Sequence, residues 1–285
     1  MKKFLFLLIG IFLPTGVHAD NFILMIGDGM GANHLKCAAK DKPIYIPTLP
    51  VKGSVHTRSA DAEITDSAAS ATAYSCGQKT NNNFIAKLPN GDDCQTIAEK
   101  AIQKGLSVGI YSTDYSTSAT SVAFFAHALH RYDPETIEKY RQEASAVMDI
   151  AVPVEKLSDE IIPRLESLSS QTDKKGFFAL FEEAFIDAQS HENHIHEMKQ
   201  ELYDFDYAVM KAVNFVYKHP DTTVIVLADH ETGGLTEEDC VYTTRDHTAA
   251  DIPVYAYGKN ASLFAGEQDN TEIHRKMETI LFNEP

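Results

Sequence analysis

The chain has 285 residues, of which 44% are hydrophobic and 23% charged, so it has the composition of a globular protein that can bury one large core. Its formal net charge of −16 excludes nucleic acid and anionic membrane surfaces as natural partners, and no basic stripe in the sequence offsets it. The excess of acid fits an acidic secreted surface, and it equally fits carboxylates that bind divalent cations inside the fold.

The first residues have the pattern of a secretion signal. A basic start is followed by a short apolar run at 4–13 and by a small-x-small pattern at 17–19. The apolar run is too short to span a bilayer, and no cysteine stands at the expected cleavage point. We therefore expect 1–19 to be a cleaved signal peptide, with no membrane anchor, and 20–285 to be a single domain that works in a periplasm or outside the cell.

Four cysteines would meet an oxidising environment there. Cys37, Cys76, Cys94 and Cys240 can pair in three ways, and their spacing matches no zinc-binding motif. The sequence leaves the connectivity open.

Apolar runs that alternate with helical stretches predict an α/β fold. The runs that indicate buried strands lie at 21–26, 107–111, 177–181, 223–228 and 252–257. Helices are expected at 93–104, 189–217 and 271–282. Because fully apolar strands joined through helices are typical of parallel sheets, we predict a three-layer α/β sandwich with a mostly parallel central sheet.

Acidic residues and a histidine follow three of these strands. Asp28, Glu182 and the pair Asp229-His230 stand at the carboxyl ends of apolar runs, where open α/β sheets place their binding sites. A carboxylate in such a poorly solvated position favours a cation. For Asp28 alone, an ordinary turn aspartate is the alternative.

Four further residues indicate a binding site only when they are considered together with the others. Asp187 and His191 are spaced i, i+4, so both would project from one helical face toward a divalent ion such as Zn²⁺, although such a pair alone is more often surface decoration. His247, in a loop before the run at 252–257, is weak by itself. Arg131 could grip phosphate oxygens or be an ordinary surface arginine.

The run at 65–73 reads Thr-Asp-Ser-Ala-Ala-Ser-Ala-Thr-Ala and predicts a helix. Thr65 or Asp66 would be its N-cap, and Gly77 would end it. Ser67 in the first turn would face free backbone N–H groups and the positive end of the helix dipole, which stabilise a phosphate or a serine alkoxide. A tightly packed structural helix is the alternative.

Taken together, these segments resemble the alkaline phosphatase family. The similarity covers Gly27-Asp28-Gly29-Met30-Gly31, the run at 65–73, Ala119-Thr120, Ala126-His127, Arg131, Glu182, Ile186-Asp187, His191, the run at 228–234 and His247-Thr248. The blocks follow the family's order along the chain, from residue 21 to about residue 258.

The resemblance implies an alkaline-phosphatase-like fold and a metal-dependent phosphate monoester hydrolase. It implies that Ser67 is the nucleophile and passes through a phosphoserine intermediate, that Arg131 binds the phosphate, and that the products are inorganic phosphate and an alcohol. It also implies two Zn²⁺ and one Mg²⁺. The implied ligands are Asp187, His191 and His247 for one zinc, Asp28, Asp229 and His230 for the other, and Asp28, Thr120 and Glu182 for magnesium.

The chain departs from its relatives in several places. The segments 132–181 and 231–246 are short, so the insertions that shape the cleft and the interface of a homodimer are missing. Ser118 stands where relatives often carry Asp or His, which leaves the third metal open. Ala188 stands where they often carry Lys or His, so we expect phosphate to be held less tightly.

Phosphodiesterases and sulfatases of the wider superfamily are the rival enzymes. Sulfatases need Cys or Ser within Cys/Ser-x-Pro-x-Arg, whereas Ser67 is followed by Ala-Ala-Ser. Diesterases usually lack the third metal site and this arginine, so Glu182 and Arg131 favour small phosphate monoesters as substrates. A metal-binding protein without activity would be expected to have lost Ser67 or Arg131, and the chain has both.

Overall fold

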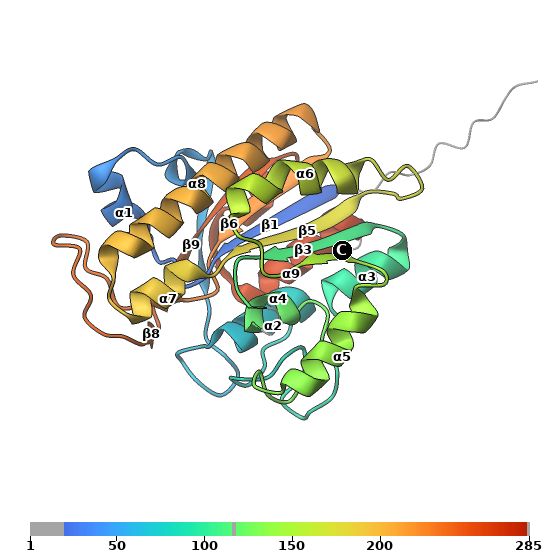
Figure 1. Ribbon diagram of the computed structural model, residues 1–285, viewed down its shortest axis with the longest axis horizontal. Coiled ribbons are helices and arrows are strands. Elements are labelled where there is room, and N and C mark those ends of the chain that lie inside the picture. Colours follow the sequence, from blue (N-terminus) through green and yellow to red (C-terminus); the bar gives the residue numbers. More distant parts are fainter. Residues whose placement is uncertain (1–19, 116–117, 284–285) are drawn as a thin grey trace, which may run out of the picture.

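The computed structural model describes residues 20–115 and 118–283. One large sheet crosses the molecule, and helices cover both of its faces (Figure 1). The expected signal peptide, 1–19, lies outside the described residues. Within the described part of the chain, no helix is long and apolar enough to cross a membrane.

The sheet has eight strands in the order β10-β2-β9-β6-β1-β5-β3-β4. The strands are β1 (Asn21–Gly27), β2 (Val51–His56), β3 (Ser107–Ser112), β4 (Asp149–Ala151), β5 (Phe177–Glu183), β6 (Thr222–Leu227), β9 (Ile252–Gly258) and β10 (Gly266–Asp269). All run in one direction except β9, which is antiparallel to β6 and to β2. The predicted mostly parallel sheet is confirmed. Two short strands, β7 (Glu231–Thr232) and β8 (His247–Thr248), form a separate antiparallel pair.

Helices form the two outer layers of the sandwich (Figure 1). One layer contains α1 (Ala32–Asp41), α6 (Leu157–Ser169), α7 (Phe185–His191) and α8 (Ile195–Lys218). The other contains α2 (Ser67–Cys76), α3 (Ile97–Lys104), α4 (Ala119–Val122), α5 (Pro134–Ala144) and α9 (Asn270–Phe282).

The single helix expected at 189–217 is wrong. The segment forms two helices, α7 and α8, which are separated at 192–194. Asn193 has a φ of +58°, a left-handed conformation that ends the first helix and that Asn adopts more easily than most residues. α7 begins directly after β5 and contacts β7, whereas α8 packs along the strands of the sheet.

The centre of the sheet is fully buried. β1 pairs with β5 on one side and with β6 on the other, and every residue from Phe22 to Ile26 has an exposure of 0%. Each such side chain contributes about 1.5–3 kcal/mol to stability when it is buried. The same burial leaves little water for any carboxylate that follows these strands.

Two disulfides settle the connectivity that the sequence left open. Cys37–Cys240 ties α1 to the segment between β7 and β8, and Cys76–Cys94 ties the end of α2 to the loop before α3.

Candidate active site

Ser67 is the first residue of α2 and is 4% exposed. Asp66 is the N-cap, because its Oδ1 accepts a hydrogen bond from Ala69 N at 2.9 Å, and Gly77 ends the helix with a φ of +69°. The predicted limits of this helix are confirmed. Ser67 Oγ lies 3.2 Å from Nε2 of His230.

Asp28, Asp229 and His230 form a buried cluster that we call the inner group. Asp28 follows β1, and the other two follow β6, which is the neighbouring strand of the sheet. His230 Nε2 lies 3.2 Å from Asp229 Oδ2 and 3.5 Å from Asp28 Oδ1. With Ser67 Oγ, three oxygens therefore converge on one ring nitrogen.

The inner group has the chemistry of a cation site. An imidazole nitrogen makes one hydrogen bond, so it cannot satisfy three oxygens. Among the described residues, Asp28 Oδ1 and Asp229 Oδ2 have no hydrogen-bond partner. Burial, and next the charge of Asp229, raises the pKa of Asp28 well above its usual range. Buried carboxylates with unpartnered oxygens are costly, and a divalent cation among these oxygens would remove that cost.

Asp187, His191 and His247 form a second cluster, the outer group, nearer the surface. His191 Nε2 lies 3.3 Å from Asp187 Oδ2 and 3.1 Å from His247 Nε2. The hydrogen bond that the His191 ring donates to Asp187 raises the pKa of His191 to about 9, whereas burial, and next the charge of His230, lowers the pKa of His247 to about 4.

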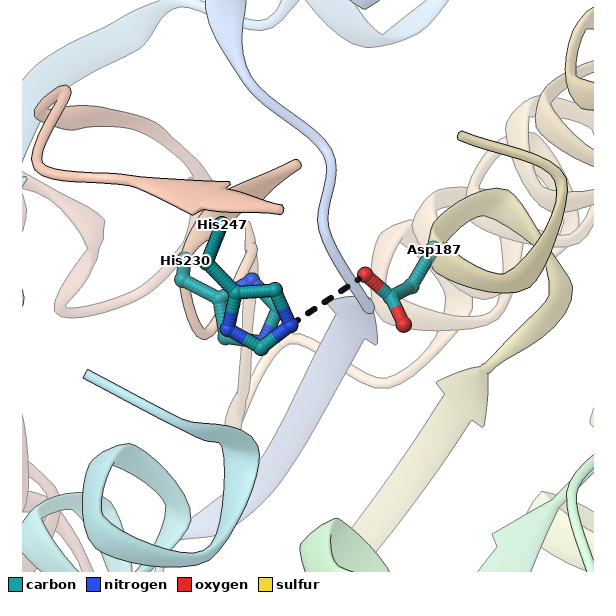
Figure 2. A group of neighbouring side chains, drawn as sticks. All are labelled: Asp187, His230 and His247. Atoms are coloured by element: carbon teal, nitrogen blue, oxygen red, sulfur yellow. Dashed lines mark ion pairs between the residues drawn. The ribbon is translucent and has the colours of Figure 1, made fainter. Parts of the chain in front are cut away.

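His230, a member of the inner group, also lies against the outer group. Figure 2 shows the imidazoles of His230 and His247 one over the other, with Asp187 facing them from α7. The two ring centroids are 3.5 Å apart. Asp187, His230 and His247 place ligand atoms within 4.8 Å of one another, and so do the three residues of the inner group.

Glu182 and Thr120 mark a third set of oxygens. Both residues are 0% exposed, at the end of β5 and in α4. Within the described residues, both carboxylate oxygens of Glu182 and Thr120 Oγ1 have no hydrogen-bond partner, and the next residue of α4, Ser121, also has an unpartnered Oγ. Burial, and next the charge of Asp114, raises the pKa of Glu182 to about 8. A donor set made of oxygens alone is the kind that Mg²⁺ prefers.

Arg131 is joined to α2 through Asp66, the N-cap of that helix. Its Nη1 donates to Asp66 Oδ2 at 3.1 Å, and Asn83 N donates to the same oxygen at 3.0 Å. The guanidinium keeps further N–H groups for a ligand, because it has five donors and this contact uses one. No sequence pattern indicates that Arg131 pairs with Asp66.

The sequence and the fold are similar to those of known proteins. The family model for alkaline phosphatase matches residues 19–162, 153–244 and 236–282, which together span almost the whole chain. The chain belongs to the alkaline phosphatase family. As a member of that family it is a phosphatase.

Two sequence relatives and one solved structure show the extent of this similarity. Alkaline phosphatase 3 of Bacillus subtilis is 25% identical over 406 aligned positions, which cover 90% of this chain and 88% of the relative. The alkaline phosphatase of Escherichia coli is 25% identical over 92% of this chain and 86% of its own. The structure of the alkaline phosphatase from the Antarctic bacterium TAB5 has a TM-score of 0.82 and 25% identity, covering 93% of this chain and 98% of that chain. Because an alignment of 406 positions exceeds the 285 residues here, the Bacillus relative carries insertions that this chain lacks.

Sequence reasoning assigned no role to Thr232. Its hydroxyl donates to Asp187 Oδ1 and lies 3.2 Å from His230 Nδ1, so it connects the outer group to the inner one. Gly29, with a φ of +71°, leaves room for this contact, since a Cβ there would lie 2.8 Å from Asp187 Oδ1 and from Thr232 Oγ1. The place of Thr232 just after His230 was visible in the sequence, but its partner Asp187 was not.

Proposed function

We propose that this alkaline phosphatase family member is a metal-dependent phosphate monoester hydrolase that acts through a phosphoserine intermediate at Ser67. The observation that carries the proposal is the position of Ser67 Oγ, 3.2 Å from His230 Nε2 and next to the unpartnered carboxylate oxygens of the inner group. A hydroxyl held at the start of α2 can attack phosphorus, and the helix N-terminus favours the negative charge that develops there.

We assign two Zn²⁺ and one Mg²⁺ by the chemistry of the donors. The inner group and the outer group combine carboxylates with imidazoles, which suits zinc, whereas Asp28, Thr120 and Glu182 offer only oxygen, which suits magnesium. A mutant of the TAB5 alkaline phosphatase has Mg bound in its M3 site, which supports magnesium as the third ion. When bound, such ions lower the pKa of hydroxyl groups and of water and neutralise phosphoryl oxygens.

The protein groups then have separate tasks. Arg131 binds phosphoryl oxygens with the N–H groups that Asp66 does not use, and Asp66 holds Arg131 and the start of α2 together. Ser67 Oγ loses its proton to solvent and bonds to phosphorus, while the P–O bond to the alcohol breaks and the leaving oxygen, which keeps the electron pair, takes up a proton from solvent. Water then cleaves the phosphoserine, which releases inorganic phosphate and restores Ser67.

The setting of the reaction is also a proposal. We infer a periplasmic or secreted enzyme from the signal-peptide pattern at 1–19, and the two disulfides support an oxidising compartment. Small phosphate monoesters are the substrates. Because the insertions of the longer relatives are missing, a homodimer stays a prediction that the mass of the protein in solution tests.

Hydrolysis of p-nitrophenyl phosphate by protein loaded with Zn²⁺ and Mg²⁺ tests the activity, and EDTA tests its dependence on metal. Ser67→Ala should keep its metals, measured by plasma mass spectrometry, but form no phosphoenzyme, measured by intact-mass analysis after a rapid quench. Faster hydrolysis of bis-p-nitrophenyl phosphate would indicate a diesterase instead. No metal-dependent hydrolysis of either ester by fully loaded protein would overturn the proposal.

A further inference from the structure

A cavity of about 390 Å³ opens beside Arg131. Its volume is within the range of small-molecule sites, roughly 300–1,000 Å³. Its walls include Asp114 and Tyr115, which follow β3, Ala119 at the start of α4, and Tyr132, which follows Arg131 before α5.

The cavity adjoins the proposed phosphoryl site through two of its walls. Arg131 lines the cavity and also binds Asp66, which immediately precedes Ser67. Ala119, on another wall, immediately precedes Thr120, whose Oγ1 is one of the unpartnered buried oxygens. A substrate whose phosphoryl group reaches Ser67 and Arg131 therefore has this hollow next to it for the rest of the molecule.

Aromatic rings flank the cavity. Tyr115 is 73% exposed and Tyr132 is 75% exposed, although both rings have large apolar faces. The ring of Tyr132 already lies against two planar groups, with its centroid 5.4 Å from that of His130 and 5.6 Å from the guanidinium carbon of Arg131. A flat ligand would extend this arrangement and cover apolar surface that now faces water.

The charges of the cavity limit what the ligand can carry. Asp114 contributes a carboxylate to its wall, and Ser118, also in the wall, offers no cation to balance it. Arg131 is the basic residue among the described lining residues, and in the proposed reaction its positive charge binds the phosphoryl group. A second phosphate on the ligand would meet Asp114 without a partner of its own.

We propose that this cavity is the leaving-group subsite and that it takes a planar, uncharged group, such as a nucleobase or an aryl ring, from a substrate with a single phosphate. The inference rests on the proposed function, because it concerns the part of the ester that Ser67 and Arg131 do not hold.

The test compares two esters of equal intrinsic reactivity. Adenosine 5′-monophosphate and glycerol 3-phosphate are both esters of primary alcohols, so a difference in kcat/KM reports on the base rather than on the bond that breaks. We expect the protein to prefer the nucleotide. Tyr132→Ala should lower kcat/KM for the nucleotide by about tenfold, which is one stacking contact, and should lower it less for glycerol 3-phosphate. Tyr132→Phe should restore the preference.

Tyr217→Ala is the matched control, because Tyr217 is 78% exposed on α8, away from this cavity, and should leave both rates unchanged. Equal losses for the two esters in Tyr132→Ala, or no loss for the nucleotide, would overturn the subsite. If neither ester is hydrolysed, the proposed function fails, and calorimetric binding of the nucleotide to the metal-loaded protein still tests the subsite. Binding that Tyr132→Ala leaves unchanged would then reject it.

Discussion

The inner and outer groups differ in the part of the fold that holds them. Asp28 and Asp229 follow two adjacent strands at the centre of the sheet, and the inner group is at most 5% exposed. The outer group comes from a helix of seven residues, α7, and from a strand of two residues, β8, and the side chain of His191 is 37% exposed. The sheet fixes the first site, whereas individual hydrogen bonds between loops and short elements fix the second.

Three such bonds hold the outer group. Thr232 donates to Asp187, the ring of His191 bonds to Arg245 O, and His247 Nδ1 bonds to Thr65 O at 3.0 Å. Parts with few buried contacts open locally at low free energy, while core strands open only with the whole domain. We therefore expect the inner group to bind its metal firmly and the outer group to exchange metal with solvent.

Equivalent substitutions in the two groups give the largest expected effects. Asp229→Asn should lower kcat/KM by about 10⁴-fold, or about 5.5 kcal/mol, because it removes a buried charge from the inner group. His191→Asn should cost less, and excess Zn²⁺ should restore part of the activity, because the outer group stays accessible. Kinetics over a zinc titration measure both. A His191→Asn protein that zinc does not rescue would contradict the difference between the groups.

The disulfides offer a second way to separate the two regions. Cys37→Ala with Cys240→Ala opens a link between residues 203 apart, and Cys76→Ala with Cys94→Ala opens one between residues 18 apart. In the chain-entropy account these links contribute roughly 5 and 3 kcal/mol. Thermal unfolding measures the loss. Only loss of the Cys37–Cys240 link should also weaken zinc binding, because Cys240 lies in the segment that leads to His247. An equal loss of zinc affinity in both double variants would contradict this expectation.

A substitution of Thr232 tests the connection between the inner and outer groups, with a smaller expected effect. Thr232→Val removes the hydroxyl that contacts Asp187 and His230 but keeps the shape of the side chain. Zinc affinity should fall by about 10–100-fold, as for other residues that orient metal ligands. Competition with a zinc-binding dye gives the affinity, and Thr232→Ser should recover most of it. An unchanged affinity in Thr232→Val would show that the hydroxyl orients nothing.

Ala188 gives the smallest expected effect. It is exposed on α7, directly after Asp187. Ala188→Lys adds a cation beside the outer group, and an exposed charge pair contributes about 0.2–1 kcal/mol. Inhibition by inorganic phosphate should therefore become up to about fivefold stronger, and Ala188→Gln should show no such change. Equal inhibition constants for Ala188→Lys and the unaltered protein would count against the expectation that this chain holds phosphate weakly.

The positions of the inner-group aspartates could be predicted from the sequence, whereas the contacts around them could not. Asp28 and Asp229 end long apolar runs. Such runs predict buried strands from neighbouring residues alone, so the positions of these two aspartates could be inferred without the tertiary structure. The direction of β9 and the break at Asn193 depend on tertiary packing, so the pattern of apolar and polar residues along the chain could not predict them. The contacts of Thr232 join residues 45 apart in the chain, and Arg131 meets Asp66 over a separation of 65. Only the assembled fold brings these partners together.

The link between Cys37 and Cys240 also sets an order of assembly. Cys240 cannot meet Cys37 until the intervening chain has been synthesised, and that stretch includes β2 to β7. The strands that carry Asp28 and Asp229 are therefore complete before the bond can close. The link that ties the segment before His247 to α1 therefore forms only after the strands of the inner group have been made.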